Sequence, residues 1–367
     1  MSAAQNFRNL SLNDVPAAVT EELRIFLDQR NDDIAKIGTP VTRAVEHLHS
    51  FVLNGGKRVR PLYGWAGFIG GGGLENSSEE PHAVLRAVSS LEFIQACALI
   101  HDDIIDSSDT RRGNPTVHRA VEKLHADSGW KGNSLHYGQS TAILIGDLAL
   151  VWAEDMWRYS GLSTEALERA AEPWRAMRTE VIGGQLLDIT LEATGAESPE
   201  LANAVNRFKT AAYTIERPLH LGAALADAPE ETISAFRGYG HDIGIAFQLR
   251  DDLLGVFGDP EITGKPAGDD LREGKRTVLL SLALARADEA DPAAAAALRA
   301  GIGTVTDPTD INKLATIIKD TGAVEQIEQQ ITTLTESGLA HLTEAGVEKH
   351  VHDRLRELAI KATERRK

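Results

Sequence analysis

The chain has 367 residues, 42% of them hydrophobic, so it can bury a large core. Its 38 basic and 54 acidic residues give a formal net charge of −16, which argues against a nucleic-acid partner because phosphate backbones attract basic faces. The single cysteine excludes an internal disulfide, the N-terminus lacks the order of a signal peptide, and the apolar runs at 142–151 and 278–285 are too short to cross a bilayer. We therefore expect a cytoplasmic protein with no transmembrane segment.

Apolar residues recur at helical spacing along most of the chain, first through Val84, Val88 and Leu91 and later through Ile243 and Phe247. Strand-like alternation is scarce. Four short segments rich in glycine and proline are expected to end helices: Asn54-Gly55-Gly56, Gly113-Asn114-Pro115, Gly258-Asp259-Pro260 and Gly264-Lys265-Pro266. Further helix boundaries are expected near Pro81, Pro173, Pro218 and Pro229. This pattern predicts an all-α protein with one domain over residues 1–367, a single large helical bundle around a deep central cavity.

The segment 55–61 gathers Lys57, Arg58 and Arg60 behind two glycines in an otherwise acidic chain. Arginine offers a planar fork to phosphate oxygens and lysine a point charge, and glycine lets the backbone approach an anion closely. The segment therefore predicts a phosphate site. The alternative is a charged helix end without a ligand, and the segment alone does not exclude it.

The segment 101–106 ends an apolar helix with Asp102, Asp103 and Asp106. Positions i and i+4 share a helix face, so Asp102 and Asp106 can direct their carboxylates to one point. Mg²⁺ prefers one or two carboxylates together with waters and phosphate oxygens. A magnesium site for a phosphorylated ligand is the expected role, and a solvated helix end is the alternative.

Two later segments carry weaker signals of the same kind. Gln185 and Asp188 share a face of an apolar helix and could orient water around a metal, or form an ordinary surface pair. Asp251 and Asp252 follow Phe247-Gln248-Leu249-Arg250 on another helix, where they could bind a second set of ions. Further cations near these segments are Arg111, Arg112, Lys209, Lys265 and Lys275. Together, the basic residues could hold two separate diphosphates.

In this order, the motifs resemble the trans-isoprenyl diphosphate synthases, the polyprenyl synthetases that make geranyl, farnesyl, geranylgeranyl and longer prenyl diphosphates. The motifs are Gly-Lys-Arg-x-Arg-Pro at 56–61, Asp-Asp-x-x-Asp at 102–106, Arg-Arg-Gly at 111–113, Gly-Gln-x-x-Asp at 184–188, Lys-Thr at 209–210, Phe-Gln-x-x-Asp-Asp at 247–252 and Gly-Lys at 264–265. The resemblance implies the isoprenoid synthase fold, a homodimer, and Mg²⁺-dependent head-to-tail condensation of isopentenyl diphosphate with an allylic diphosphate.

The resemblance also implies residue roles. The metal ligands would be Asp102, Asp106, Asp251 and Asp252. The catalytic set would be Asp102, Asp103, Asp106, Arg111, Lys209, Thr210, Gln248, Asp251 and Lys265. The substrate-binding set would be Lys57, Arg58, Arg60, Gln95, Arg111, Arg112, Gln185, Asp188, Lys209, Thr210, Gln248, Lys265 and Lys275. Within it, Thr210 and Gln248 would lie beside the reacting carbon, where a hydroxyl and a carbonyl dipole stabilise positive charge.

Two positions depart from the family pattern. Many relatives have histidine where Gln95 stands, and the second acidic motif has Gly255 in place of a third aspartate. Product length would depend on Cys97 and Ala98, which lie five and four residues before Asp102 on the same helix, because a growing tail would pass there. In this family, small side chains at these positions imply room for about four isoprene units or more, and geranylgeranyl diphosphate is the expected product; packing alone is the alternative explanation of their size.

Three other functions remain open at this stage. A non-catalytic regulatory subunit of a heteromeric synthase would be expected to lose site residues that this chain keeps. A class I terpene cyclase would carry a different second metal motif. A farnesyl or longer-chain polyprenyl diphosphate synthase would share every motif and differ only in product length.

Overall fold

The computed structural model describes residues 7–259 and 267–364. The contacts divide the chain into two compact units: unit 1 contains residues 1–173 and 218–229, and unit 2 contains residues 174–217 and 230–367. The division cuts the chain near Pro173, Pro218 and Pro229, three of the expected helix boundaries. Whether the two units act as one domain stays a prediction.

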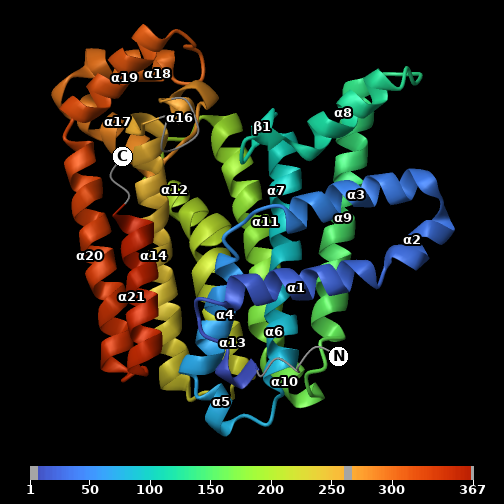
Figure 1. Cartoon of the computed structure of the whole chain (residues 1–367). Coiled ribbons are helices and arrows are strands. Elements are labelled where there is room, and N and C mark those ends of the chain that lie inside the picture. The colour runs from blue at the N-terminus through green and yellow to red at the C-terminus, as the bar shows by residue number, and fades with distance from the viewer. Residues whose placement is uncertain (1–6, 260–266, 365–367) are drawn as a thin grey trace. The chain divides into compact units, whose positions relative to one another are not determined.

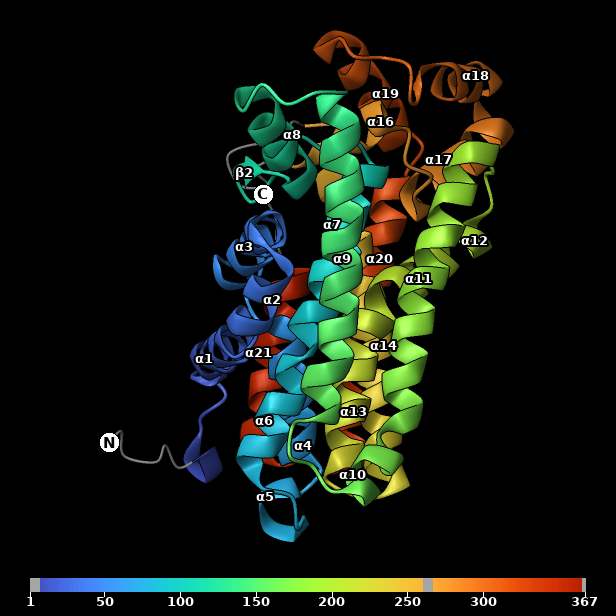
Figure 2. The same cartoon turned by 90° about the vertical axis from the view of Figure 1, so that its right-hand side faces the viewer.

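Unit 1 is helical apart from one short hairpin. Its elements are the 3₁₀ helix η1 (Phe7–Asn9), α1 (Val15–Asp28), α2 (Asn31–Ile37), α3 (Thr39–Leu53), α4 (Val59–Gly70), α5 (Gly73–Asn76), α6 (Pro81–Ser89), α7 (Leu91–Ile105), β1 (Thr110–Arg111), β2 (Asn114–Pro115), α8 (Val117–Asp127), α9 (Ser134–Arg158), α10 (Thr164–Arg169) and nearly all of α13 (Arg217–Leu225). The strands pair antiparallel, Thr110 opposite Pro115. Helices α7 and α9 pack side by side (Figure 2).

The core of unit 1 is aromatic around α7. The ring of Phe93 lies 5.1 Å from that of Phe26 and 6.3 Å from that of Trp152, in tilted and edge-on arrangements that aromatic pairs prefer. These contacts join α1, α7 and α9. They hold the N-terminal part of α7 rigidly, so its C-terminal end can present polar residues.

Unit 2 contains the longest helix among the described residues. Its elements are α11 (Ala171–Thr194, except its first three residues), α12 (Pro199–Val205), the π-helix η2 (Asn206–Glu216), α14 (Glu230–Phe257), α16 (Asp269–Glu273), α17 (Val278–Ala290), α18 (Pro292–Gly301), α19 (Pro308–Asp320), α20 (Ala323–Glu344) and α21 (Lys349–Thr363). In Figure 1, α14 lies beside α20 and α21.

Helix α14 is fixed along its length by its neighbours in unit 2. Leu249 and Leu253 belong to the buried apolar cluster of this unit. At one end, the Tyr239 hydroxyl donates to the carbonyl of Leu355 at 2.7 Å. At the other, Arg250 donates to the carbonyl of Thr363 and to both carboxylate oxygens of Glu328. These contacts therefore fix the position of the part of α14 that carries the residues after Arg250.

The all-α prediction is confirmed, because β1 and β2 are the only strands in the described part of the chain. Helix α3 ends at Leu53 and α14 ends at Phe257, where the Gly-rich stops were expected. Pro173 and Pro218 lie in the first turns of α11 and α13, where proline is tolerated.

One apolar stretch, Pro81–Ile105, is long and apolar enough to cross a membrane, and the expectation of short apolar runs overlooked it. It spans α6 and α7, and 72% of its most apolar window is buried inside the protein. That burial is typical of core helices in folded domains. No other described helix passes the same test.

Candidate active site

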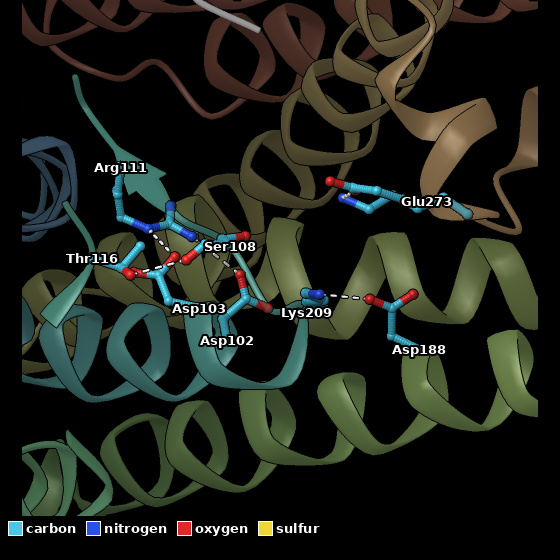
Figure 3. Close-up of polar contacts among 9 residues, drawn as sticks. Asp102, Asp103, Ser108, Arg111, Thr116, Asp188, Lys209 and Glu273 are labelled. Carbon is cyan, nitrogen blue, oxygen red and sulfur yellow. Dashed lines mark hydrogen bonds and ion pairs between the residues drawn. The ribbon is translucent and has the colours of Figure 1, made fainter. Parts of the chain in front are cut away.

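The first acidic motif ends α7 in unit 1, and its members face different surroundings. Asp102 and Asp106 are partly exposed, one turn apart. Asp103 is only 1% exposed, and its Oδ1 accepts a hydrogen bond from Arg111 Nε at 2.7 Å (Figure 3). Arg111 also lies 3.3 Å from Asp102 Oδ2. Arg111 therefore joins the buried carboxylate to an accessible one.

Burial dominates the electrostatics of Asp103. It raises the pKa of this carboxyl to about 6, against the opposing charge and hydrogen bond of Arg111. The Oδ2 atom of Asp103 has no hydrogen-bond partner within the described ranges. Asp103 thus holds Arg111 in place through its hydrogen bond, while Asp102 and Asp106 are partly exposed, where a cation could reach them.

The hairpin β1–β2 positions the two arginines of the Arg-Arg-Gly motif. Its base is fastened because Thr116 Oγ1 donates to the carbonyl of Ser108 at 2.9 Å (Figure 3). Arg112, at the tip, has φ 54°, a left-handed conformation that is uncommon for a residue with a side chain. Such strained residues are concentrated at functional sites. The two arginines therefore point in different directions from adjacent positions.

Arg112 packs over the glycines of the first basic segment. A Cβ atom at Gly56, which has φ 94°, would lie 3.5 Å from both terminal nitrogens of Arg112. Burial and the guanidinium groups of Arg58 and Arg60 lower the pKa of Arg112, against the opposing charge of Glu92. Gln95, on α7 of the same unit, is half-buried. We refer to Lys57, Arg60, Gln95 and Arg112 as the candidate anion-binding cluster.

Arg58 occupies a different place from its neighbours. It is 4% exposed, its Nη1 donates to Glu92 at 2.7 Å, and its Nη2 donates to the carbonyl of Val52 at 2.7 Å. Its backbone also has a positive φ, 51°. The structure therefore commits this guanidinium to the protein interior. Sequence reasoning missed Glu92, although a lone acidic residue in the apolar start of α7 is a signal of a buried partner.

In unit 2, the π-helix η2 carries Lys209 and Thr210. Its backbone approaches two neighbouring helices closely: a Cβ at Gly184 of α11 would lie 2.3 Å from Lys209 N, and one at Gly244 of α14 would lie 2.5 Å from Ala211 Cα. Only glycine fits at both places. Wide π-turns are frequent at functional sites.

The side chains of η2 are paired with α11 and α14. Lys209 Nζ lies 2.5 Å from Asp188 Oδ2 (Figure 3), and Thr210 Oγ1 donates to Gln248 Oε1 at 2.9 Å. Asp188 therefore positions a lysine in this structure. Gln185, one turn before Asp188 on α11, is half-buried.

The second acidic motif lies on α14, and its two carboxylates differ. Asp251 is partly exposed, whereas Asp252 is 3% exposed and accepts a hydrogen bond at Oδ1 from Gln248 Nε2 at 2.9 Å. Burial raises the pKa of Asp252 to about 8, against that hydrogen bond. Its Oδ2 finds no hydrogen-bond partner among the residues that the structure describes. Asp251 is thus the accessible member of the pair.

The place of the missing third aspartate is filled by another carboxylate. A Cβ at Gly255 would lie 2.0 Å from Asp270 Oδ2, so Asp270 of α16 occupies the space that a side chain at 255 would need. Sequence reasoning gave Asp270 no role, because only folding brings α16 onto α14. Lys275 follows α16 and pairs with Glu273 at 3.0 Å. Lys265 lies outside the described residues.

Over the described ranges, no group of three or more His, Cys, Asp or Glu side chains is gathered closely enough to hold a metal by itself. The residues fit Mg²⁺ nevertheless, because this ion takes one or two carboxylates per site and completes its shell with water and phosphate oxygens. Asp102 with Asp106 in unit 1, and Asp251 in unit 2, are accessible carboxylates of this kind. Such sites would be completed by a phosphorylated ligand.

The two expected product-length residues lie on different faces of α7. Ala98 is four positions before Asp102 and shares its face with Gln95, and all three are partly exposed. Cys97 Sγ lies 3.7 Å from His101 Nδ1. Burial raises the pKa of the Cys97 thiol to about 12. Ala98 is therefore the residue on the face of the first acidic motif.

Comparisons with known proteins agree with this geometry. The polyprenyl synthetase family profile matches residues 41–321. The geranylfarnesyl diphosphate synthase of Aeropyrum pernix is 35% identical over 80% of this chain and 84% of its own length. The crystal structure of geranylgeranyl pyrophosphate synthase from Corynebacterium glutamicum, complexed with isoprenyl diphosphate and magnesium, is 64% identical with a TM-score of 0.94, and the match covers 97% of this chain and 100% of that one.

Proposed function

The chain belongs to the polyprenyl synthetase family, and from that premise we propose that it joins isopentenyl diphosphate to an allylic diphosphate, head to tail, with all-trans geometry. One observation carries the proposal most directly. In unit 1, the accessible carboxylate of Asp102 is paired with Arg111, and in unit 2 the accessible Asp251 follows Gln248 by three residues on α14, where Gln248 accepts from Thr210.

Asp102, Asp106 and Asp251 would hold Mg²⁺ together with the allylic diphosphate. When bound, the ion neutralises the charge that collects on a diphosphate leaving group. The magnesium in the Corynebacterium glutamicum complex supports this assignment. Asp252 was expected among the ligands, and its burial on α14 favours a different role.

The cations of the chain would bind the two substrates separately. The candidate anion-binding cluster of unit 1 would hold the diphosphate of isopentenyl diphosphate, with Gln95 as a neutral donor where relatives have histidine. Further cations would hold the allylic diphosphate; they are Arg111, Lys209, Lys265 and Lys275. Asp188 would keep Lys209 extended by its 2.5 Å contact, and Gln185 would orient water nearby.

The reaction then follows from charge development. The allylic carbon–oxygen bond breaks, positive charge forms on the carbon, and the double bond of isopentenyl diphosphate attacks it. Oxygen atoms of Thr210 and Gln248 would stabilise that charge. The departing diphosphate takes the proton that the new intermediate releases, which leaves the carbon skeleton neutral.

We propose geranylgeranyl diphosphate as the main product. The small side chain of Ala98 on the face of Asp102 leaves room for a tail, and the solved structure at 64% identity is a geranylgeranyl synthase. The relatives also include geranylfarnesyl and farnesyl diphosphate synthases, so products one isoprene unit longer or shorter are the alternatives that the product analysis distinguishes. As in the family, we expect a cytoplasmic homodimer, which light scattering would measure.

The experiment is incubation with isopentenyl diphosphate, Mg²⁺ and, in turn, dimethylallyl, geranyl and farnesyl diphosphate, followed by chromatography of the dephosphorylated products. All three starters should give geranylgeraniol as the main alcohol. Absence of any elongated product from the folded protein would refute the proposed reaction, and a different alcohol would refute only the chain length.

A further inference from the structure

The second acidic motif contains a carboxylate that is turned away from any accessible surface. Asp252 is 3% exposed, whereas its neighbour Asp251 is partly exposed. Gln248, one turn earlier on α14, donates a hydrogen bond to Asp252 Oδ1, and Asn206 also acts on this carboxyl to lower its pKa. Mg²⁺ needs room for several waters around a carboxylate ligand, and a side chain this deeply buried offers little.

The hydrogen bonds of Asp252 fix the direction of a short chain of polar groups. In the structure Gln248 Nε2 donates to Asp252 Oδ1 and Gln248 Oε1 accepts from Thr210, an arrangement that suits an ionised carboxylate and also the carbonyl oxygen of a protonated one. Thr210 then has to donate its only hydroxyl hydrogen to Gln248. Its remaining lone pairs are all that the hydroxyl can present to a substrate.

We propose that Asp252 is a positioning residue, which orients the Gln248 amide so that Gln248 and Thr210 present oxygen rather than hydrogen to the developing carbocation. The inference rests on the proposed prenyl transfer. If the Gln248 amide turned over, its nitrogen would face Thr210, and the hydroxyl hydrogen would be free to point at the positive charge. Asp252 thus acts through two other side chains.

The interface around this chain of groups is rigid enough to hold it. Gly244, one turn before Gln248 on α14, lets η2 approach to within backbone contact, at Ala211 beside Thr210. Arg250 ties the same part of α14 to Glu328 and Thr363. Because both helices are fixed, the Gln248 amide can still rotate so that its oxygen and nitrogen exchange places. The hydrogen bond to Asp252 disfavours that rotation.

Two substitutions separate a positioning role from metal binding. Asp252→Asn keeps an acceptor for Gln248 and cannot ionise, whereas Asp252→Leu has the same number of side-chain heavy atoms and offers no acceptor. The first should lower kcat by less than about threefold and the second by roughly 10- to 100-fold. KM for either diphosphate and the Mg²⁺ concentration at half-maximal rate should stay at wild-type values in both. If the two variants lose kcat equally and need more Mg²⁺, the positioning role is wrong.

A double-mutant cycle with Gln248→Leu tests whether Asp252 acts through that residue. On this background Asp252→Leu should cost less than about twofold in kcat, because the group it orients is gone. Full additivity of the two losses would overturn the proposal. Thermal unfolding of each variant shows whether the fold is kept, and Asp252→Asn is the variant most nearly equal in shape to the wild type.

A binding measurement without turnover completes the test. Electron paramagnetic resonance counts the Mn²⁺ bound with an unreactive allylic thiodiphosphate, in which sulfur replaces the bridging oxygen. Asp252→Asn should bind as many Mn²⁺ ions as the wild type, and Asp251→Asn should bind fewer. A loss in Asp252→Asn equal to that in Asp251→Asn would assign Asp252 to the metal. If the wild type itself binds no Mn²⁺ with the analogue, the proposed function fails, and the positioning role fails with it.

Discussion

Arg111 Nε lies 2.7 Å from Asp103 Oδ1, and this bond gives a buried carboxylate its cationic partner. Removing the guanidinium leaves Asp103 buried without a charge partner. We expect Arg111→Ala to lower the free energy of unfolding by about 3 kcal/mol, since breaking one side of a buried pair costs that much. Urea denaturation measures the change.

The exposed pair of Arg119 and Asp109 is the matched control for that measurement, because Arg119→Ala should cost less than about 1 kcal/mol. In the double variant Arg111→Ala with Asp103→Asn, part of the loss should return, since the orphaned charge is removed. Equal losses for Arg111→Ala and Arg119→Ala would contradict a buried pair.

The raised pKa of Asp252, about 8, predicts how stability depends on pH in the metal-free protein. Between about pH 4 and pH 8 the unfolded state releases this proton and the folded state keeps it. The folded state therefore loses stability as pH rises through that window. Asp252→Asn cannot ionise, so its stability relative to the wild type should increase from pH 5 to pH 8.

Urea denaturation in EDTA at both pH values measures that difference. Asp320→Asn, which removes an exposed carboxylate at the end of α19, is the control and should show no such pH-dependent gain. A constant difference between Asp252→Asn and the wild type would show that Asp252 ionises normally in the fold.

The Cys97 thiol should react slowly in the native protein. Its pKa is raised to about 12 by burial, so very little thiolate exists at pH 8, and the thiolate is the nucleophile. Alkylation by iodoacetamide, followed by mass spectrometry, should be at least about 100-fold faster after denaturation in urea. Comparable rates in the two states would mean that the thiol is accessible and ordinary.

Ala98 and Cys97 give a direct test of product length. Ala98→Phe places a ring on the face of Asp102 and should shorten the main product by at least one isoprene unit. Cys97→Phe should also shorten it, but with a lower melting temperature, because the ring must displace His101 from its 3.7 Å contact. Chromatography of the product alcohols and a thermal melt measure both effects. An unchanged product profile in both variants would remove α7 from the control of chain length.

Much of the site could be predicted from the sequence because its residues come as short motifs on helices. Spacing alone places Asp102 and Asp106 on one face, and the glycine stops mark the ends of α3 and α14. The partners are what spacing does not predict. Arg58 was expected to bind substrate with Lys57, but Glu92, far along the chain, draws it into the interior.

Long-range packing explains the other differences. Nothing local indicates that η2 is a π-helix; it needs glycines on two other helices to let its wide backbone fit. The contact of Asp270 with Gly255 depends on how α16 returns to α14. The different burial of Asp251 and Asp252 follows from the orientation of α14, which no single residue determines.

The most direct test of the central claim is the steady-state rate of prenyl transfer by the wild type, Asp102→Ala and Asp251→Ala in excess Mg²⁺. The account predicts that each variant keeps its fold by circular dichroism and loses at least about 100-fold in kcat, because each removes a carboxylate that would hold metal at the leaving group. Wild-type turnover in either folded variant would contradict it.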